Sequence, residues 1–113
     1  MAIDPSGFSI STSDSDGRAV VTIRGELDLA TAPDLETVVL ERLDAGQDVV
    51  LDLRELQFMD SSGLRVLVTA HARAADGDGG LRFAVVRPPA GSEVAKILEI
   101  AGVGQQLDVV DEP

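Results

Sequence analysis

Short stretches of alternating apolar and polar residues indicate β-strands, because successive side chains of a strand point to opposite faces. The predicted strands are residues 8–11, 19–24, 48–53, 81–86 and 107–110. A cluster of turn residues at 13–17 separates the first two stretches and predicts an antiparallel hairpin, joined by a short turn that contains Asp16-Gly17. Residues 1–7 precede the first strand, and we expect them to be frayed.

Between the later strands, apolar residues recur every three or four positions, which is typical of amphipathic helices. Three helices are predicted, beginning near Thr31, Ser61 and Ser92. Thr31 with Asp34 three residues later is close to a capping box, and Gly102 is a stop signal after the third helix. The positions expected to face the core are Leu35, Val38, Val39 and Leu43 in the first helix, Leu64, Leu67, Val68, His71 and Ala75 in the second, and Val94, Ile97, Leu98 and Ala101 in the third.

The element order β-β-α-β-α-β-α-β predicts a single α/β domain over residues 1–113, with its core at about 8–110. Right-handed parallel crossovers would give a mixed, mostly parallel five-stranded sheet in the order 1-2-3-4-5. Polar residues such as Arg24 share one parity along the strands, so we expect helices mainly on one face of the sheet. This order brings Asp28 beside Asp60 and Ser61 at the carboxyl edge of the strands, where sites of parallel sheets lie.

The segment Asp60-Ser61-Ser62-Gly63 follows a buried strand and a short polar link, and precedes the second helix. Asp and Ser side chains accept hydrogen bonds from the free N–H groups of a first helical turn, so an ordinary helix cap explains each residue singly. Together they predict a serine hydroxyl exposed beside an acid at the positive end of a helix. Gly63 lacks a side chain, and we expect this to matter for folding and also to let a partner approach closely.

Composition narrows the class of partner. The net charge of −11 opposes binding to nucleic acid or to an anionic membrane, and suits a partner with a basic surface. The chain has no Cys, which excludes disulfides and thiolate metal sites. No secretory signal and no apolar run of bilayer length is visible, so we expect a cytoplasmic protein.

The sequence gives little support for catalysis. A serine nucleophile needs a base, and the one histidine, His71, lies in the apolar stripe more than two turns from Ser61. A phospho-acceptor aspartate would need a nearby lysine, but the one lysine, Lys96, lies within the third predicted helix. Glycines 77, 79 and 80 follow a helix, so they predict a turn and not a phosphate-binding loop. We expect no catalytic residue, no metal site and no cofactor.

Residues 58–64 closely resemble the phosphorylation site of STAS-domain anti-sigma-factor antagonists, which are small bacterial regulators that bind an anti-sigma protein kinase. The segments 25–28 and 32–35 carry a second feature of that family, and the resemblance extends over about residues 8–110. It implies a STAS-like fold with Ser61 as the phospho-acceptor. It also implies a partner-binding face that includes Asp28, Asp60, Ser61, Ser62 and Gly63.

The resemblance further implies that the protein binds an anti-sigma serine/threonine kinase, and that this binding releases a sigma factor. The kinase, which supplies the base and the magnesium site, then phosphorylates Ser61, and a phosphatase resets the switch. We expect a monomer or a weak dimer. Two alternatives remain, namely a STAS subunit of a lipid or anion transport assembly and an enzyme that uses Ser61. Asp28 and Asp60 either orient the serine, contact the kinase, or are solvated loop acids.

Overall fold

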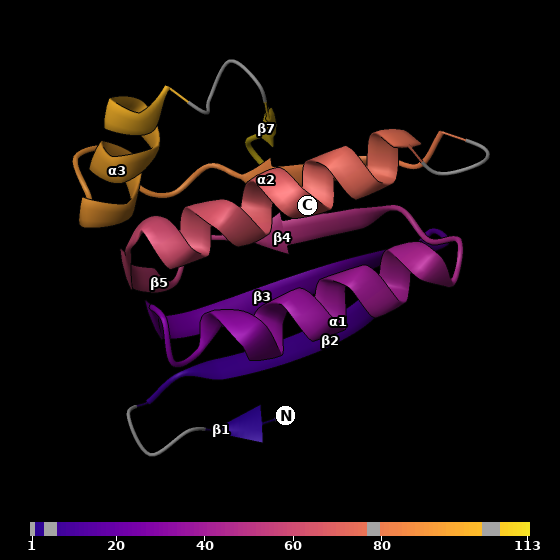
Figure 1. Ribbon diagram of the computed structural model, residues 1–113, viewed down its shortest axis with the longest axis horizontal. Coiled ribbons are helices and arrows are strands. Elements are labelled where there is room, and N and C mark those ends of the chain that lie inside the picture. The colour runs from indigo at the N-terminus through magenta and orange to yellow at the C-terminus, as the bar shows by residue number, and fades with distance from the viewer. Residues whose placement is uncertain (1, 4–6, 77–79, 103–106) are drawn as a thin grey trace.

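Seven strands form one mixed β-sheet in the computed structural model, which describes residues 2–3, 7–76, 80–102 and 107–113 (Figure 1). The strands are β1 (Ala2–Ile3), β2 (Ser9–Ser15), β3 (Arg18–Leu27), β4 (Val49–Asp52), β5 (Leu56–Met59), β6 (Phe83–Val86) and β7 (Asp108–Val110). The helices are α1 (Ala32–Asp44), α2 (Ser61–Asp76) and α3 (Glu93–Ala101).

The five strands predicted from the sequence correspond to β2, β3, β4, β6 and β7. Their predicted order in the sheet is confirmed as β2-β3-β4-β6-β7. β2 and β3 are antiparallel, whereas the pairs β3–β4, β4–β6 and β6–β7 are parallel. Val21 lies beside Leu51, and Leu51 lies beside Val85. All three side chains are fully buried, so one row of apolar residues crosses the middle of the sheet.

Two short strands lie where the sequence pattern predicts none. β1 pairs antiparallel with β2, so the expectation of a frayed start is wrong for Ala2–Ile3. β5 pairs parallel with β3, in the segment expected to be a polar link. The end residues of β5 are buried and its middle residues are exposed, so neither strict alternation nor a continuous apolar run marks it.

The turn of the β2–β3 hairpin is shorter than the predicted cluster. Pairing continues to Ser15 opposite Arg18, which leaves Asp16 and Gly17 as the turn. Both residues have positive φ, 54° and 81°, which suits an Asp-Gly pair in a two-residue hairpin loop.

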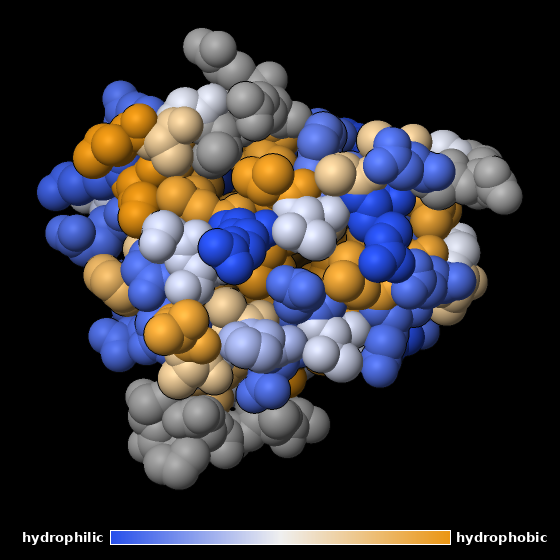
Figure 2. All heavy atoms as spheres, viewed as in Figure 1, coloured by the Kyte–Doolittle hydropathy of each residue, from blue (hydrophilic) through white to orange (hydrophobic). Residues whose placement is uncertain are grey.

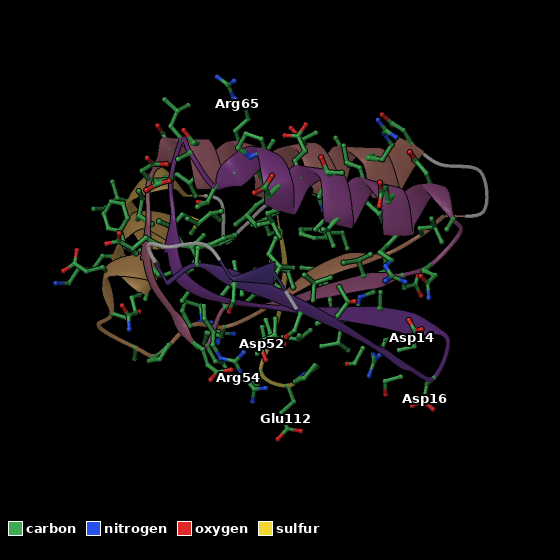
Figure 3. The ribbon with its side chains drawn as sticks, turned by 90° about the horizontal axis from the view of Figure 1, so that it is seen from below. Asp14, Asp16, Asp52, Arg54, Arg65 and Glu112 are labelled. Atoms are coloured by element: carbon green, nitrogen blue, oxygen red, sulfur yellow. The ribbon has the colours of Figure 1, made fainter. Side chains whose placement is uncertain are left out.

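α1 and α2 cover the same face of the sheet, while α3 packs against β5 at one end (Figures 1 and 3). The predicted core face of α1 is confirmed at Leu35, Val39 and Leu43, which are buried. In α3, Val94 and Leu98 are buried, as predicted. Ser92 caps α3 by accepting a hydrogen bond from the Ala95 N–H at 3.1 Å, and Gly102 ends the helix in a left-handed conformation. Ala101 is exposed, so that part of the predicted face is wrong.

The predicted core face of α2 is rotated relative to the real one. Val68 is 43% exposed and Ala75 is exposed, whereas Leu64 and His71 are only partly buried. The residues of α2 that are buried are Gly63, Val66, Leu67, Ala70 and Ala74. Both sets have helical spacing, but the small side chains of the second set allow α2 to lie close to the sheet and to α1.

Ion pairs line the face of the sheet that the helices leave uncovered, where Asp52 and Arg54 are labelled in Figure 3. Asp52 is only 4% exposed and accepts a hydrogen bond from Arg54 Nη2 at 2.8 Å, and Arg82 pairs with Asp108. Burial alone would raise the pKa of Asp52, but the side-chain and backbone hydrogen bonds from Arg54 and the charges of Arg54 and Arg24 bring it below its ordinary value. The second face of the sheet is therefore partly polar, as predicted.

Candidate functional site

The ends of β3 and β5 lie side by side at one edge of the sheet, and the segment Asp60-Ser61-Ser62-Gly63 begins there. β3 and β5 are parallel neighbours with Leu27 beside Met59, and the N–H of Asp60 donates to the carbonyl of Leu27 at 3.2 Å. Asp28 and Asp60 therefore leave adjacent strands, as predicted. The strand that delivers Asp60 is the unexpected β5, which follows the buried strand β4 along the chain.

Asp60 caps the start of α2. Its Oδ1 accepts hydrogen bonds from the N–H groups of Ser62 at 2.8 Å and Gly63 at 3.4 Å. Ser61 is the first residue of the helix and is exposed, whereas Ser62 is half-buried. The serine that a second protein can reach most easily is therefore Ser61.

Asp28 holds the loop between β3 and α1. Its Oδ1 accepts hydrogen bonds from the N–H groups of Ala30 at 3.0 Å and Thr31 at 3.2 Å. Thr31 Oγ1 accepts from the Asp28 N–H and donates to the Glu26 carbonyl, each at 2.9 Å. Thr31 occupies the N-cap position of α1, as predicted, but its side chain faces back into this loop and makes no capping hydrogen bond, so the predicted capping box with Asp34 is wrong.

The two carboxylates shape the backbone on either side of the serine. Among the described residues, each accepts its hydrogen bonds from backbone N–H groups or a threonine hydroxyl, and none of these bonds reaches the Ser61 hydroxyl. Of the roles considered for Asp28 and Asp60, orientation of the serine therefore has no hydrogen bond to support it. Their positions beside an exposed serine remain compatible with contact to a partner.

A groove lies between the first turns of α1 and α2. It has a volume of about 460 Å³ and is lined by Leu29, Ala32, Pro33, Glu36, Thr37, Ser61, Ser62, Arg65 and Val66. Leu29 is 78% exposed although it is a large apolar residue. One exposed leucine is ordinary on a protein surface, but this one shares a groove with Ser61, where a partner that reaches the serine would cover it.

Arg65 gives this groove a positive charge that no acid in the described structure neutralises by direct contact. Every other arginine and the lysine forms a hydrogen bond or an ion pair, whereas Arg65 forms neither with the residues that the structure describes. Figure 3 shows Arg65 extending outward from the helical layer, on the opposite side of the molecule from Asp52 and Arg54.

Gly63 faces the core and not the groove. A Cβ atom at this position would lie 2.5 Å from Met59 Cγ and 2.8 Å from Leu27 Cδ2. These contacts support the predicted importance of Gly63 for folding, whereas the other expected reason, close approach of a partner, is wrong because a side chain here would face the core. Glycine is needed here because the start of α2 packs directly on the ends of β3 and β5.

The other chemistry-bearing residues do not join Ser61. His71 lies almost three turns further along α2 and is half-buried, and Lys96 lies on α3 with its Nζ 3.9 Å from Glu93. The part of the chain that the structure describes holds no cluster of three acidic or histidine side chains fit for a metal ion. In that same part, no helix is long and apolar enough to span a bilayer. The predicted glycine turn at 77–80 falls largely outside the described residues.

Leu29 and Arg65 are two groove residues that the sequence pattern does not single out. Leu29 occupies a short loop between a turn aspartate and a helix start, where an apolar side chain packs inward as readily as outward. Arg65 follows Ser61 by one helical turn, and this spacing can be read from the sequence. Whether an acid from another element neutralises it is a property of the tertiary structure.

Comparison with known proteins agrees with this architecture. The family model described as "Mlab, STAS domain" matches residues 10–111. The chain belongs to the STAS-domain family. RsfB, an anti-sigma-F factor antagonist of Mycobacterium tuberculosis, is 32% identical to this STAS domain over 83 residues, which is 73% of the chain and 66% of that relative, or just under two thirds of its length. The anti-sigma F factor antagonist of Paenibacillus polymyxa is 31% identical over 97 residues, which is 84% of the chain and 80% of that relative.

Solved structures share the fold of this STAS domain. An anti-sigma factor antagonist from Mycobacterium paratuberculosis superposes with a TM-score of 0.82 at 23% identity, covering 98% of this chain and 92% of that one. The Bacillus cell fate determinant SpoIIAA in its phosphorylated form superposes with a TM-score of 0.63 at 20% identity, covering 93% of this chain and 92% of that one. At these identities the likeness establishes the α/β fold alone.

Proposed function

We propose that this STAS domain is an anti-sigma-factor antagonist that binds an anti-sigma serine/threonine kinase while it is unphosphorylated. The observation that carries the proposal is the exposed Ser61 at the start of α2, in a groove shared with Leu29 and Arg65. The relatives that are named as antagonists of anti-sigma factors support it. Binding occupies the kinase and releases a sigma factor, and the STAS domain itself catalyses nothing.

The kinase phosphorylates Ser61 and not Ser62. Ser61 is exposed, whereas Ser62 is half-buried and its N–H is held by Asp60 at 2.8 Å. The kinase supplies the base and the magnesium site, because phosphoryl transfer depends on positioning and charge stabilisation around ATP. A phosphatase later restores the hydroxyl. Asp28, Asp60 and the Gly63 backbone fix the shape of the face on which the kinase docks.

Phosphorylation ends the interaction because the partner surface fits a small hydroxyl. The phosphate adds about −1.5 to −2 charges, and an unpaired charge buried in an interface costs several kcal/mol. Since each 1.4 kcal/mol is about tenfold in affinity, we expect a loss of roughly a hundredfold or more. The domain itself remains folded because Ser61 is exposed and the phosphate has no core to enter.

Incubation of the protein with the anti-sigma kinase encoded by the same genome tests the proposal. Intact-mass measurement should show one added phosphate with ATP and none without it, and tandem mass spectrometry should locate it on Ser61. Ser61→Ala should stay folded, bind the kinase and accept no phosphate, while the matched control Ser62→Ala should still be phosphorylated. Phosphate found on Ser62, or a Ser61→Ala protein that is still modified, would overturn the assignment.

The alternative of a STAS subunit in a lipid or anion transport assembly makes a different prediction. Such a subunit would co-purify with an ATP-binding transporter subunit and would need no phosphate on Ser61. The antagonist names of the relatives favour the kinase partner over this alternative.

A further inference from the structure

We infer that Arg65 captures the phosphate of phosphorylated Ser61 within the same molecule, and that phosphorylation thereby also removes a cation from the docking groove. The inference rests on the proposed modification of Ser61. It adds a second component to the switch, because the surface loses a free positive charge at the same time as it gains a negative one.

The geometry of α2 brings the two side chains together. Ser61 and Arg65 are four residues apart on one helix, so they lie on the same face about one turn from each other. Long side chains on a helix lean toward its N-terminus, so the Arg65 side chain can reach a phosphate on Ser61. Both residues line the same groove.

Two of the usual donors at a helix start are already occupied. A phosphate on the first residue of a helix normally binds the free N–H groups of the first turn. Here Asp60 Oδ1 accepts from the N–H groups of Ser62 and Gly63, at 2.8 Å and 3.4 Å. The guanidinium of Arg65 is a remaining strong donor, and guanidinium groups bind phosphate through two parallel hydrogen bonds.

Arg65 is available for this role because it has no other partner among the described residues. The acid that lines the same groove is Glu36, on α1, and no ion pair joins it to Arg65. Glu36 and Asp60 both repel a phosphate on Ser61, which makes neutralisation by Arg65 more favourable. A phosphate with about −1.5 to −2 charges also attracts the guanidinium more strongly than a carboxylate does.

In the unphosphorylated protein, the same guanidinium points out from the helical layer (Figure 3) and can donate hydrogen bonds to an acidic side chain of the kinase. After phosphorylation, Arg65 is held by the phosphate of its own helix. The kinase then meets an additional anion and loses a cation at the same place.

The test is a phosphate titration that needs no kinase. Phosphoserine is incorporated at position 61 by genetic code expansion, and the second pKa of its phosphate, ordinarily about 6, is measured by phosphorus NMR. A nearby opposite charge favours the charged form, so we expect this pKa to be higher in Arg65→Gln than in the wild-type sequence by about 0.5–1 unit. Arg65→Lys should restore part of the difference. The matched control is Arg73→Gln, on the same helix, whose guanidinium binds Asp44 at 2.6 Å.

The result that supports the inference is a shift in Arg65→Gln that Arg73→Gln does not reproduce. A second readout is thermal melting, in which Arg65→Gln should lower the melting temperature of the phosphorylated form more than that of the unphosphorylated form. Equal phosphate pKa values in the wild type and Arg65→Gln overturn the inference, as does an equal shift in Arg73→Gln, which would reflect net charge alone. Neither outcome contradicts the proposed kinase interaction, because the phosphate is installed without the kinase. Conversely, failure of the kinase to modify Ser61 would not change the result of this titration.

Discussion

Replacement of Gly63 by alanine should destabilise the domain, although alanine is the better helix former. Gly63 is in the first turn of α2, where the substitution gains at most about 1 kcal/mol from helix propensity. Against this gain, the new Cβ would lie 2.5 Å from Met59 Cγ and 2.8 Å from Leu27 Cδ2. Both neighbours are at most 2% exposed, so neither can move away into solvent.

The magnitude follows from these two opposing effects. Added volume in a packed core costs about 1–3 kcal/mol, and two simultaneous overlaps place this site toward the upper part of that range. We expect a net loss of about 1–2 kcal/mol in the free energy of unfolding, which is a fall of about 4–8 °C in melting temperature for a domain of this size. Kinase affinity, measured at a temperature where both the wild type and the variant are folded, should change by less than about threefold. The reason is that the added side chain faces the core and not the groove.

Thermal and urea melts of the single and double variants provide the assay. In Met59→Ala the nearest overlapping atom is absent, so Gly63→Ala should cost less in that background, with a coupling of at least about 0.5 kcal/mol. A Gly63→Ala protein that melts at or above the wild-type temperature would refute the reasoning. Strictly additive losses in the double variant would show that Met59 does not determine the cost.

Three further predictions concern other parts of the molecule. Ser61→Asp should weaken kinase binding in calorimetry by at least about tenfold while the melting temperature stays within about 2 °C of wild type, and tight binding by this variant would contradict the charge-based switch. Leu29→Ala should reduce kinase affinity by about tenfold or more, since burying a leucine at an interface contributes about 1.5–3 kcal/mol, with little loss of stability because Leu29 is 78% exposed; an unchanged affinity would place Leu29 outside the interface. Asp52→Asn should lower the free energy of unfolding at pH 7 by about 1 kcal/mol, a modest loss because solvent screens the half-exposed Arg54 side chain. Because the folded-state pKa of Asp52 lies below its ordinary 3.8, the stability contributed by this carboxylate is present above that pH and lost as the pH falls through the folded pKa. The difference in free energy of unfolding between wild type and Asp52→Asn, measured by urea melts, should therefore shrink below about pH 4. A difference that stays constant with pH would exclude the carboxylate as its cause.

The sequence by itself determined the features that depend on neighbouring residues. Local conformational preferences explain the Asp16-Gly17 turn, the cap at Ser92 and the helix start at Ser61. The connection rules for parallel strands explain the order of the five predicted strands. The position of an exposed serine after an acid is likewise local, because Asp60 caps the very turn that begins at Ser61.

Only the tertiary structure decided which side of each element faces the core and which side chains meet. β5 forms because its backbone pairs with β3, a long-range interaction that leaves no alternation in the sequence. The side of α2 that is buried depends on how the helix rotates against the sheet, and two overlapping sets of residues satisfy the helical period equally well. The same rotation turns Gly63 toward Met59 and Leu27. It also leaves Arg65 without an acid within contact distance among the described residues, because the acids that could neutralise it come from other elements, whose distance no local pattern encodes.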